Sequence, residues 1–380
     1  MVASNASAAA AGRLRAVGAE LGRCFLERTE VIEGALAALV ARQHLLLVGP
    51  PGTAKSMLAD ELCRRIEGAD YFAWLLTKFT TPEEVFGAVS LRALELDEYR
   101  RVTTGKLPEA HVAFLDEVFK ASSSILNALL TILNERRFHN GRETLTVPLL
   151  TLFGAANELP EEEELVAVMD RFLLRFVVDY LVEDWRFLRM LVASPVAPEA
   201  KISLDDLRLL QARADAIEVP DAVLRSIAEI RGELRRRGLT PSDRRFRQGV
   251  GLLRALALVR GRDRVGDDEI LFLEHVLWRD PAERGTVREV LRSLVHGFDE
   301  QVQEILFQGR ELGEYAARDW DSGEERARAR IEVETKLRQL LRQIDDLERR
   351  ARESGRDLRR ASGAREEIEA IRRGLGGGAA

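Results

Sequence analysis

Residues 44–62 read HLLLVGPPGTAKSMLADEL, and this stretch decides the fold. The apolar run at 44–48 has the length of a strand, and apolar residues recur at helical spacing after Met57, so the sequence predicts a buried strand, a loop and a helix. The loop GPPGTAKS matches the phosphate-binding pattern GxxxxGK[ST], except that Ala54 stands where the pattern has its last glycine. The stretch therefore predicts an α/β domain with a parallel sheet.

The residue types in this loop suit a phosphate and a magnesium ion. Backbone N–H groups and the helix dipole would hold a β-phosphate, Lys55 would reach the β- and γ-phosphates, and Ser56 would ligate Mg²⁺. An ordinary Gly/Pro turn is the alternative. The predicted nucleotide-binding residues are Gly49, Pro50, Pro51, Gly52, Thr53, Ala54, Lys55, Ser56 and Met57.

A second buried strand is predicted at VAFLDE, residues 112–117, which ends in two carboxylates. Asp116 would join the Mg²⁺ shell, and Glu117 would polarise an attacking water. A capping pair at the start of the next helix is the alternative. The carboxylates and the loop lie about 60 residues apart in the sequence, and together they describe one nucleotide site.

Two further segments carry candidate site residues. The apolar run at 147–160 predicts another central strand and places Asn157 beside the γ-phosphate, where it would orient the hydrolytic water; a turn or helix cap is the alternative. The segment DRFLLRF has Arg171 and Arg175 four residues apart, which predicts one helical face. Either arginine would serve as a finger that reaches a neighbouring subunit's nucleotide, or as a surface salt bridge.

The composition narrows the class of protein. The chain has 380 residues, 46% of them hydrophobic, and a formal net charge of -6, which favours two or three domains and disfavours a generally basic nucleic-acid-binding body. Cys24 and Cys63 form no CxxC pair, and no histidine falls at a zinc-ligand spacing, so no transition-metal site is predicted. Without a signal-like start or a long uncharged run, we expect a cytoplasmic protein with no integral membrane association.

The second half of the chain has helical periodicity. Apolar spacings of three and four from residue 202 to residue 278 predict a small all-helical domain, which a last helix at 266–278, capped by an aspartate, would close. From about residue 323, apolar residues repeat as a short heptad seam that Ser354-Gly355 breaks, which fits an antiparallel helical hairpin or an intermolecular coiled coil. The final GLGGGAA predicts a flexible tail. The predicted domains are 1–195, 196–280 and 281–380.

Six segments in order resemble an AAA+ ATPase of the MoxR family, closest to the RavA branch: GPPGTAKS, FTTPEEVFG, HVAFLDEVFKASSSILNALLTILNERRFHNG, GAANELP, DRFLLRF and SDRRF. The resemblance runs from about residue 12 to about residue 300. It implies an AAA+ P-loop parallel-sheet core with a helix-2 insert, an all-α lid and a C-terminal helical extension. Such proteins also carry Ala before the lysine, so Ala54 fits. A further β-rich insert expected of RavA is missing.

The resemblance assigns roles at the phosphate end of the site. It implies that Lys55 and Ser56 are the Walker A lysine and Mg²⁺ ligand, and that Asp116 and Glu117 are the Walker B pair. Asn157 takes the place of the sensor 1 residue.

The resemblance also implies roles for arginines. Arg171 would be the arginine finger, with Arg175 as its rival, and Arg244 would be sensor 2 in the lid, with Arg245 as its rival. The segment at 27–36 stands where such proteins line the adenine pocket.

Two insertions are the candidates for contacting a substrate or partner. Residues 134–148 predict a hairpin turned at Asn140-Gly141, which would interrupt the helix that begins after Asp116. In the assembled ring of related proteins, such a hairpin and the TTPEEVFG loop at 80–87 would face the centre. Structural loops that pack a subunit interface are the alternative.

The function implied by the resemblance is an ATP-hydrolysing, ring-forming remodeller with chaperone-like action on a protein client. It would use ATP and Mg²⁺, assemble as a homo-hexamer and work with a partner bearing a von Willebrand factor A (VWA) domain. A nucleic-acid motor is one alternative, kept open by Arg136, Arg137 and Arg142 in the hairpin. A nucleotide-dependent scaffold or switch is the other, which Glu117 disfavours. No residue or motif in the sequence indicates which protein is the client.

Overall fold

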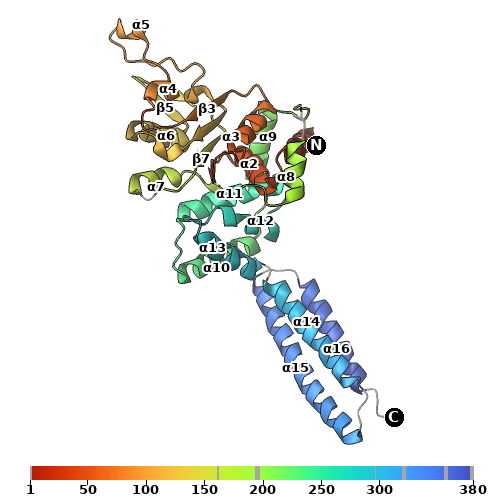
Figure 1. The fold of residues 1–380 in the computed structure, drawn as a ribbon. Helices are drawn as coiled ribbons and strands as arrows, with labels where there is room; N and C mark the ends of the chain where they lie inside the picture. Colours follow the sequence, from red (N-terminus) through yellow and green to blue (C-terminus); the bar gives the residue numbers. More distant parts are fainter. Residues whose placement is uncertain are drawn as a thin grey trace. The chain divides into compact units, whose positions relative to one another are not determined.

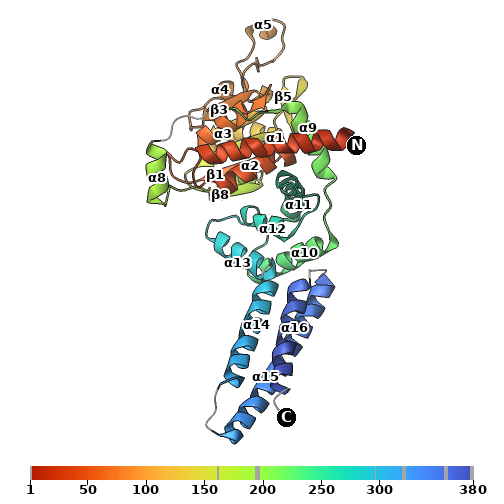
Figure 2. The ribbon, with the colours of Figure 1, turned by 90° about the vertical axis from the view of Figure 1, so that its right-hand side faces the viewer.

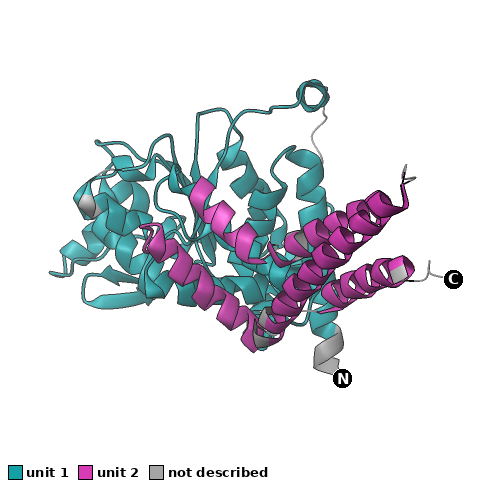
Figure 3. Cartoon of the chain, turned by 90° about the horizontal axis from the view of Figure 1, so that it is seen from below, with its two compact units in different colours: residues 1–219, 241–284 teal, residues 220–240, 285–380 magenta. Residues whose placement is uncertain are grey.

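The computed structural model describes residues 2–160, 162–192, 197–295, 297–318, 322–354 and 358–376 (Figure 1). The chain divides into two compact units: unit 1 is Met1–Val219 with Pro241–Arg284, and unit 2 is Pro220–Thr240 with Gly285–Ala380 (Figure 3). These limits differ from the predicted boundaries at 195 and 280, because the helix at 243–259 packs with unit 1. Among the described helices, none is both long and apolar enough to cross a membrane.

Unit 1 alternates helices and strands along the chain. Its elements are α1 (Val2–Cys24), α2 (Thr29–Ala41), β1 (Leu45–Val48), α3 (Lys55–Arg64), β2 (Ile66–Glu67), β3 (Tyr71–Leu75), α4 (Pro82–Phe86), α5 (Leu91–Leu94), η1 (Leu107–Glu109), β4 (Val112–Asp116), η2 (Val118–Lys120), α6 (Ser123–Glu135), β5 (Arg137–Asn140), β6 (Glu143–Thr146), β7 (Thr151–Ala156), α7 (Glu163–Met169), β8 (Leu174–Val177), α8 (Asp184–Leu191), β9 (Ile202–Ser203), α9 (Leu204–Asp215), α11 (Asp243–Val259), α12 (Asp267–Leu271) and η3 (Phe272–His275).

A five-stranded sheet with the order β3-β4-β7-β1-β8 forms the centre of unit 1, and all its neighbouring strands are parallel. The predicted strands at 44–48 and 112–117 and the predicted central strand within 147–160 are confirmed as β1, β4 and β7, each ending within a few residues of the prediction. Their largely apolar runs are typical of strands covered on both faces, and every residue of β1 and β7 is buried. Because the strands are parallel, the carboxyl-terminal ends of β1, β4 and β7 lie on the same side of the sheet.

The helices around the sheet bury apolar residues at helical spacing. In α6, Ile125, Leu129 and Ile132 are all buried in the same core cluster as the β4 residue Leu115. Each such side chain stabilises the fold by roughly 1.5–3 kcal/mol. The alanine-rich α1 also packs into unit 1 through buried residues such as Leu14, although no helix is predicted there from the sequence.

The predicted hairpin exists, but two of its details are wrong. It does not interrupt a helix: α6 ends at Glu135, Arg136 adopts a left-handed conformation, and the hairpin then leads toward β7. The turn residues are Gly141 and Arg142, because Asn140 is the last residue of β5 and pairs with Glu143. The turn starts one residue later than predicted because Gly141, with φ +66°, takes the first turn position.

Three other local predictions also need correction. DRFLLRF is not a helix, because its second half forms β8 beside β1. The predicted loop at 80–87 contains α4, whose capping box joins Thr81 and Glu84. The stretch at 266–278 is not one helix capped by an aspartate. The N–H of Gly266 donates to Glu269 instead, and α12 passes into η3 after Leu271.

Unit 2 contains α10 (Asp221–Arg236), most of α13 (Glu283–Val295), α14 (Gly297–Ala316), α15 (Gly323–Ser354) and α16 (Arg359–Gly376). Figures 1 and 2 show α14, α15 and α16 side by side. The heptad residues of α15 are buried in one cluster with apolar residues of the other two helices, so the seam serves an intrachain core. The predicted break after Ser354 begins at Gly355, which lies outside the described residues. The predicted flexible tail is wrong for residues 374–376, which form the end of α16, and residues 377–380 lie outside the described residues.

Candidate nucleotide-binding site

The loop between β1 and α3 has a backbone that accounts for its glycines. Gly49 has φ +154°, and a Cβ there would lie 1.8 Å from the carbonyl oxygen of Val178, so only glycine fits. Ala54 precedes α3 with φ 62° and ψ 25°, the left-handed conformation that glycine adopts most easily. The departure from the general pattern thus retains the backbone shape, at a cost of roughly 1–2 kcal/mol for an alanine.

Lys55 is buried inside this loop. Its Nζ donates to the carbonyl oxygens of Gly49, at 2.7 Å, and Pro50, at 2.8 Å. Burial lowers the pKa of Lys55, and the nearby carboxylates of Asp116 and Glu117 oppose that shift. The ammonium group is therefore held where the loop carbonyls can be exchanged for stronger anionic partners such as phosphate oxygens.

The predicted acidic pair and the predicted amide come together at the same edge of the sheet. Glu117 has a left-handed backbone, with φ 51°, which turns its side chain away from the line of β4. Asn157, which follows β7, donates from Nδ2 to Glu117 Oε1 at 2.5 Å. Asp116 Oδ1 accepts the Glu117 N–H at 3.0 Å. The β4 carboxylates and the β7 amide therefore form one constellation.

Lys120 is a member of this group that the sequence analysis missed. Its Nζ lies 3.3 Å from Glu117 Oε1, the same oxygen that accepts from Asn157. Spacing of three residues within a helical turn was the available signal, because such residues face one another. Two donors on one oxygen fix the orientation of the Glu117 carboxylate and leave Oε2 as its second acceptor.

A cavity of about 380 Å³ lies at the segment expected to line a base pocket. Its wall combines apolar groups, including Val31, Phe176 and Val178, with the polar side chains of Arg28 and Arg186. Val178 is also the residue whose carbonyl oxygen crowds Gly49, so cavity and phosphate loop are adjacent. Burial lowers the pKa of Arg28, which donates to the backbone of Asp179.

Arg175 and Arg245, the two rivals for the arginine roles, are enclosed in unit 1. Arg175 has no exposed surface and donates to the carbonyl oxygens of Trp278 and Met169. Arg245 is 1% exposed and donates to Asp170 Oδ1 at 2.9 Å and to backbone carbonyls of neighbouring segments. Neither guanidinium can reach a nucleotide on another chain without leaving these partners.

Arg244 is exposed and lies near the amino-terminal ends of the strands, whereas Lys55 lies near their carboxyl-terminal ends. It donates to Asn134 Oδ1 at 2.8 Å, in the last turn of α6. Arg136, the residue directly after α6, donates to the carbonyl oxygen of Arg42, just before β1 begins. The end of α6 and the start of β1 are therefore adjacent, whereas Lys55 follows the end of β1.

Arg171 also lies near the amino-terminal ends of the strands, shortly before the first residue of β8. Burial and the adjacent Arg244 guanidinium both lower the pKa of Arg171, and Asp170 opposes them. The structure therefore brings Arg171 and Arg244 together and separates both from this chain's own phosphate loop.

A projecting arm at residues 88–102 was missed by the sequence analysis, and it carries α5 at its end (Figure 1). Asn140 holds it to the hairpin, because its side chain accepts from the Arg101 N–H at 2.7 Å and donates to the Arg101 carbonyl at 3.1 Å. Leu91 and Leu96 are exposed on the arm. The arm and the hairpin therefore form one joined structure.

Comparison with protein families gives matches over most of unit 1 and beyond. Residues 12–212 match the family described as "MoxR domain in the MoxR-vWA-beta-propeller ternary systems". Residues 222–291 match an AAA lid domain.

Several known proteins are similar to this chain. An uncharacterized protein of Methanocaldococcus jannaschii is 39% identical over 292 residues, which cover 76% of each chain. Chaperone MoxR1 of Mycobacterium tuberculosis is 28% identical over 272 residues, or 66% of this chain and 71% of that protein. The crystal structure of a candidate ATPase from Cytophaga hutchinsonii has a TM-score of 0.62 and 17% identity, and the match covers 78% of this chain and 97% of that one. The fold is thus α/β AAA+, and the chain belongs to the MoxR family of AAA+ ATPases.

Proposed function

We propose that this protein hydrolyses ATP and uses the energy to remodel a protein client. The observation that carries the proposal is the meeting of Lys55, Glu117 and Asn157 at one edge of the sheet, with Asp116 beside them. A phosphate-binding loop alone would suit any nucleotide-binding protein. The additional carboxylate and amide are the groups that in-line attack by water on a γ-phosphate requires.

Ser56 and Asp116 would hold the Mg²⁺. A hydroxyl and a carboxylate are oxygen donors, which this hard cation prefers, and both residues border the loop that would carry the phosphates. Bound Mg²⁺ would neutralise charge that develops on the β- and γ-phosphates. Lys55 would exchange its two loop carbonyls for phosphate oxygens, which makes its hydrogen bonds charge-assisted at both ends.

Glu117 would act as the general base for the attacking water. The hydrogen bond from Asn157 orients the carboxylate, so the base and the amide can share one water between them. The 380 Å³ cavity would hold the base of the nucleotide, because an apolar wall beside the phosphate loop suits a flat aromatic ring.

Arg171 and Arg244 would act on the nucleotide of a neighbouring copy. Two adjacent guanidinium groups repel one another, and an anion placed between them would relieve that repulsion. The phosphate loop of the same chain lies at the opposite ends of the strands, which supports action in trans. A homo-hexameric ring is the assembly we propose, and the finger would contribute about 10³- to 10⁵-fold in rate.

The matched family description supports a VWA-domain protein as the partner, and the name of the mycobacterial relative supports chaperone-like action. Within the MoxR family, membership of the RavA branch is the finer assignment that we propose. The arm and hairpin would contact the client through exposed apolar residues such as Leu91 and Leu96. Arg137 and Arg142 are exposed on the same hairpin, so a nucleic-acid substrate is the second candidate.

Steady-state ATPase activity should be measured against protein concentration, together with particle mass by light scattering with and without ATP. We expect activity that rises with assembly and is abolished by Glu117→Gln. Glu67→Gln is the matched control, because this exposed carboxylate lies on β2, outside the five-stranded sheet. A trace of activity from a monomer, unchanged by Glu117→Gln, would refute hydrolysis and leave a nucleotide-dependent scaffold.

Two additional measurements separate the finer proposals. An excess of Arg171→Ala subunits mixed with wild type should reduce activity more than dilution does, whereas proportional loss would contradict action in trans. Salt-sensitive stimulation of the ATPase by DNA would favour the nucleic-acid motor over a protein remodeller.

A further inference from the structure

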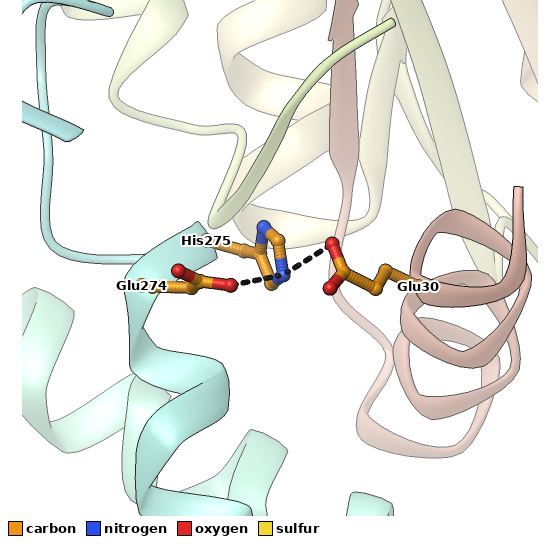
Figure 4. A group of neighbouring side chains, drawn as sticks. All are labelled: Glu30, Glu274 and His275. Atoms are coloured by element: carbon orange, nitrogen blue, oxygen red, sulfur yellow. Dashed lines mark ion pairs between the residues drawn. The ribbon is translucent and has the colours of Figure 1, made fainter. Parts of the chain in front are cut away.

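A buried histidine faces two carboxylates beside the proposed base cavity. His275, at the end of η3, is 1% exposed, and its ring packs against Phe176 and Phe272 with centroid separations of 4.5 and 4.8 Å. Its Nε2 lies 3.5 Å from Glu30 Oε2 and 3.5 Å from Glu274 Oε1 (Figure 4). The two rings therefore fix an imidazole whose outer nitrogen points at both acids.

Both Nε2–oxygen separations match the spacing of ligand atoms around one metal ion. A direct N–H···O hydrogen bond would place the atoms about 2.9–3.0 Å apart, which is shorter than either separation. Tetrahedral coordination with metal–ligand bonds of about 2.0–2.2 Å places neighbouring ligand atoms roughly 3.3–3.6 Å apart. One donor atom from each of the three residues lies within 4.8 Å of the others, so a single ion can reach all three.

We propose that Glu30, Glu274 and His275 bind a transition-metal dication of the Zn²⁺ class. An imidazole ligand favours such ions over Mg²⁺ and Ca²⁺, which prefer all-oxygen shells. Three protein ligands leave the fourth tetrahedral position for water or for a ligand group. The Glu30 side chain is 61% exposed, which gives the ion a path from solvent.

The ion would join two parts of unit 1 that are far apart in sequence. Glu30 belongs to the first turn of α2 and also lines the 380 Å³ cavity, whereas Glu274 and His275 belong to η3. A bound ion would therefore fix η3 against one wall of that cavity. The site does not depend on the proposed ATPase activity, because it shares no residue with the phosphate loop or with Glu117.

The experiment is titration of the full chain with Zn²⁺, without nucleotide or Mg²⁺, followed by competition with a chromophoric chelator. Co²⁺ in place of Zn²⁺ would report coordination geometry through its visible absorption. Glu30→Gln and His275→Gln are the test variants. His111→Gln is the matched control, because His111 also lies 3.5 Å from a carboxylate, that of Asp70.

We expect one Zn²⁺ per wild-type chain and at least about 100-fold weaker binding in both test variants, with His111→Gln unchanged. Zn²⁺ at 100 times its dissociation constant should raise the folding equilibrium constant of the wild type about 100-fold, and that gain should be lost in Glu30→Gln. Asp116→Asn, which removes the proposed Mg²⁺ ligand, should bind Zn²⁺ as the wild type does.

Failure to bind Zn²⁺, or equal binding by wild type and Glu30→Gln, would overturn the proposal and leave a histidine paired with carboxylates. Glu30→Gln is decisive, because its exposed side chain can be changed without disturbing the core. Far-ultraviolet circular dichroism of that variant verifies that the fold is retained.

Discussion

The neighbouring arginines Arg244 and Arg245 provide the sharpest test of the site assignments. In Arg245→Met, the buried guanidinium is removed from Asp170 Oδ1, at 2.9 Å, and from the carbonyl oxygen of Leu173, at 2.6 Å. Loss of one partner of a buried ion pair costs about 3–5 kcal/mol. Asp170 is 31% exposed and can be rehydrated, so we take the lower value of about 3 kcal/mol.

At about 2–4 °C per kcal/mol, this loss lowers the melting temperature of Arg245→Met by roughly 6–12 °C. Arg244 is exposed and makes its hydrogen bond at the surface, so Arg244→Met should change stability by no more than about 0.5 kcal/mol. Its effect should fall on kcat for ATP hydrolysis instead.

Differential scanning calorimetry and ATPase assays on the two purified variants test this contrast. The reasoning is refuted if Arg244→Met unfolds at as low a temperature as Arg245→Met, or if Arg245→Met melts with the wild type. A variant Arg245→Met that is stable but inactive would move the sensor 2 role to the buried residue.

Three other predictions follow from single contacts. Lys120→Met should lower kcat by no more than about fivefold with KM for ATP unchanged and with rescue by Lys120→Arg, since an exposed ion pair contributes about 1 kcal/mol at most; a changed KM would contradict this. Asn140→Ala should cost about 1–3 kcal/mol and speed hydrogen exchange in residues 88–102, whereas unchanged exchange would show that the arm is held otherwise. Burial favours a raised pKa for Glu20, but hydrogen bonds from Ala200 and Arg65 outweigh it and lower the pKa. Its stabilisation is therefore present above about pH 4.5 and lost as pH falls through the folded pKa, and Glu20→Gln should flatten that acid slope in urea unfolding.

The sheet and the phosphate loop could be predicted because their signals are local. Strands β1, β4 and β7 are largely apolar runs, and the glycines at 49 and 52 mark the loop within a few residues. In each case the residues that produce the structure lie within the segment itself, so the sequence pattern was sufficient.

The failures share a physical cause: the deciding partners are distant in the sequence. The spacing of Arg171 and Arg175 indicated a helix, but Arg175 lies in β8 and its partner Trp278 is over 100 residues away. The arm at 88–102 mixes apolar and charged residues without a clear period, and its contact with Asn140 has no local signature. The cluster of Glu30 with His275 escaped detection for the same reason.

Lys55 and Arg244 lie at opposite ends of the strands of one sheet, and this placement has a consequence for the symmetry of an assembly of subunits. With the proposed action in trans, a subunit offers arginines at one end of its strands and receives a neighbour's arginines at the other end, so it has two different contact surfaces. A two-fold dimer, in which one patch meets its own copy, would leave such surfaces unmatched. Heterologous, head-to-tail contact satisfies both, and it yields a closed ring or an open helical filament according to the rotation per subunit.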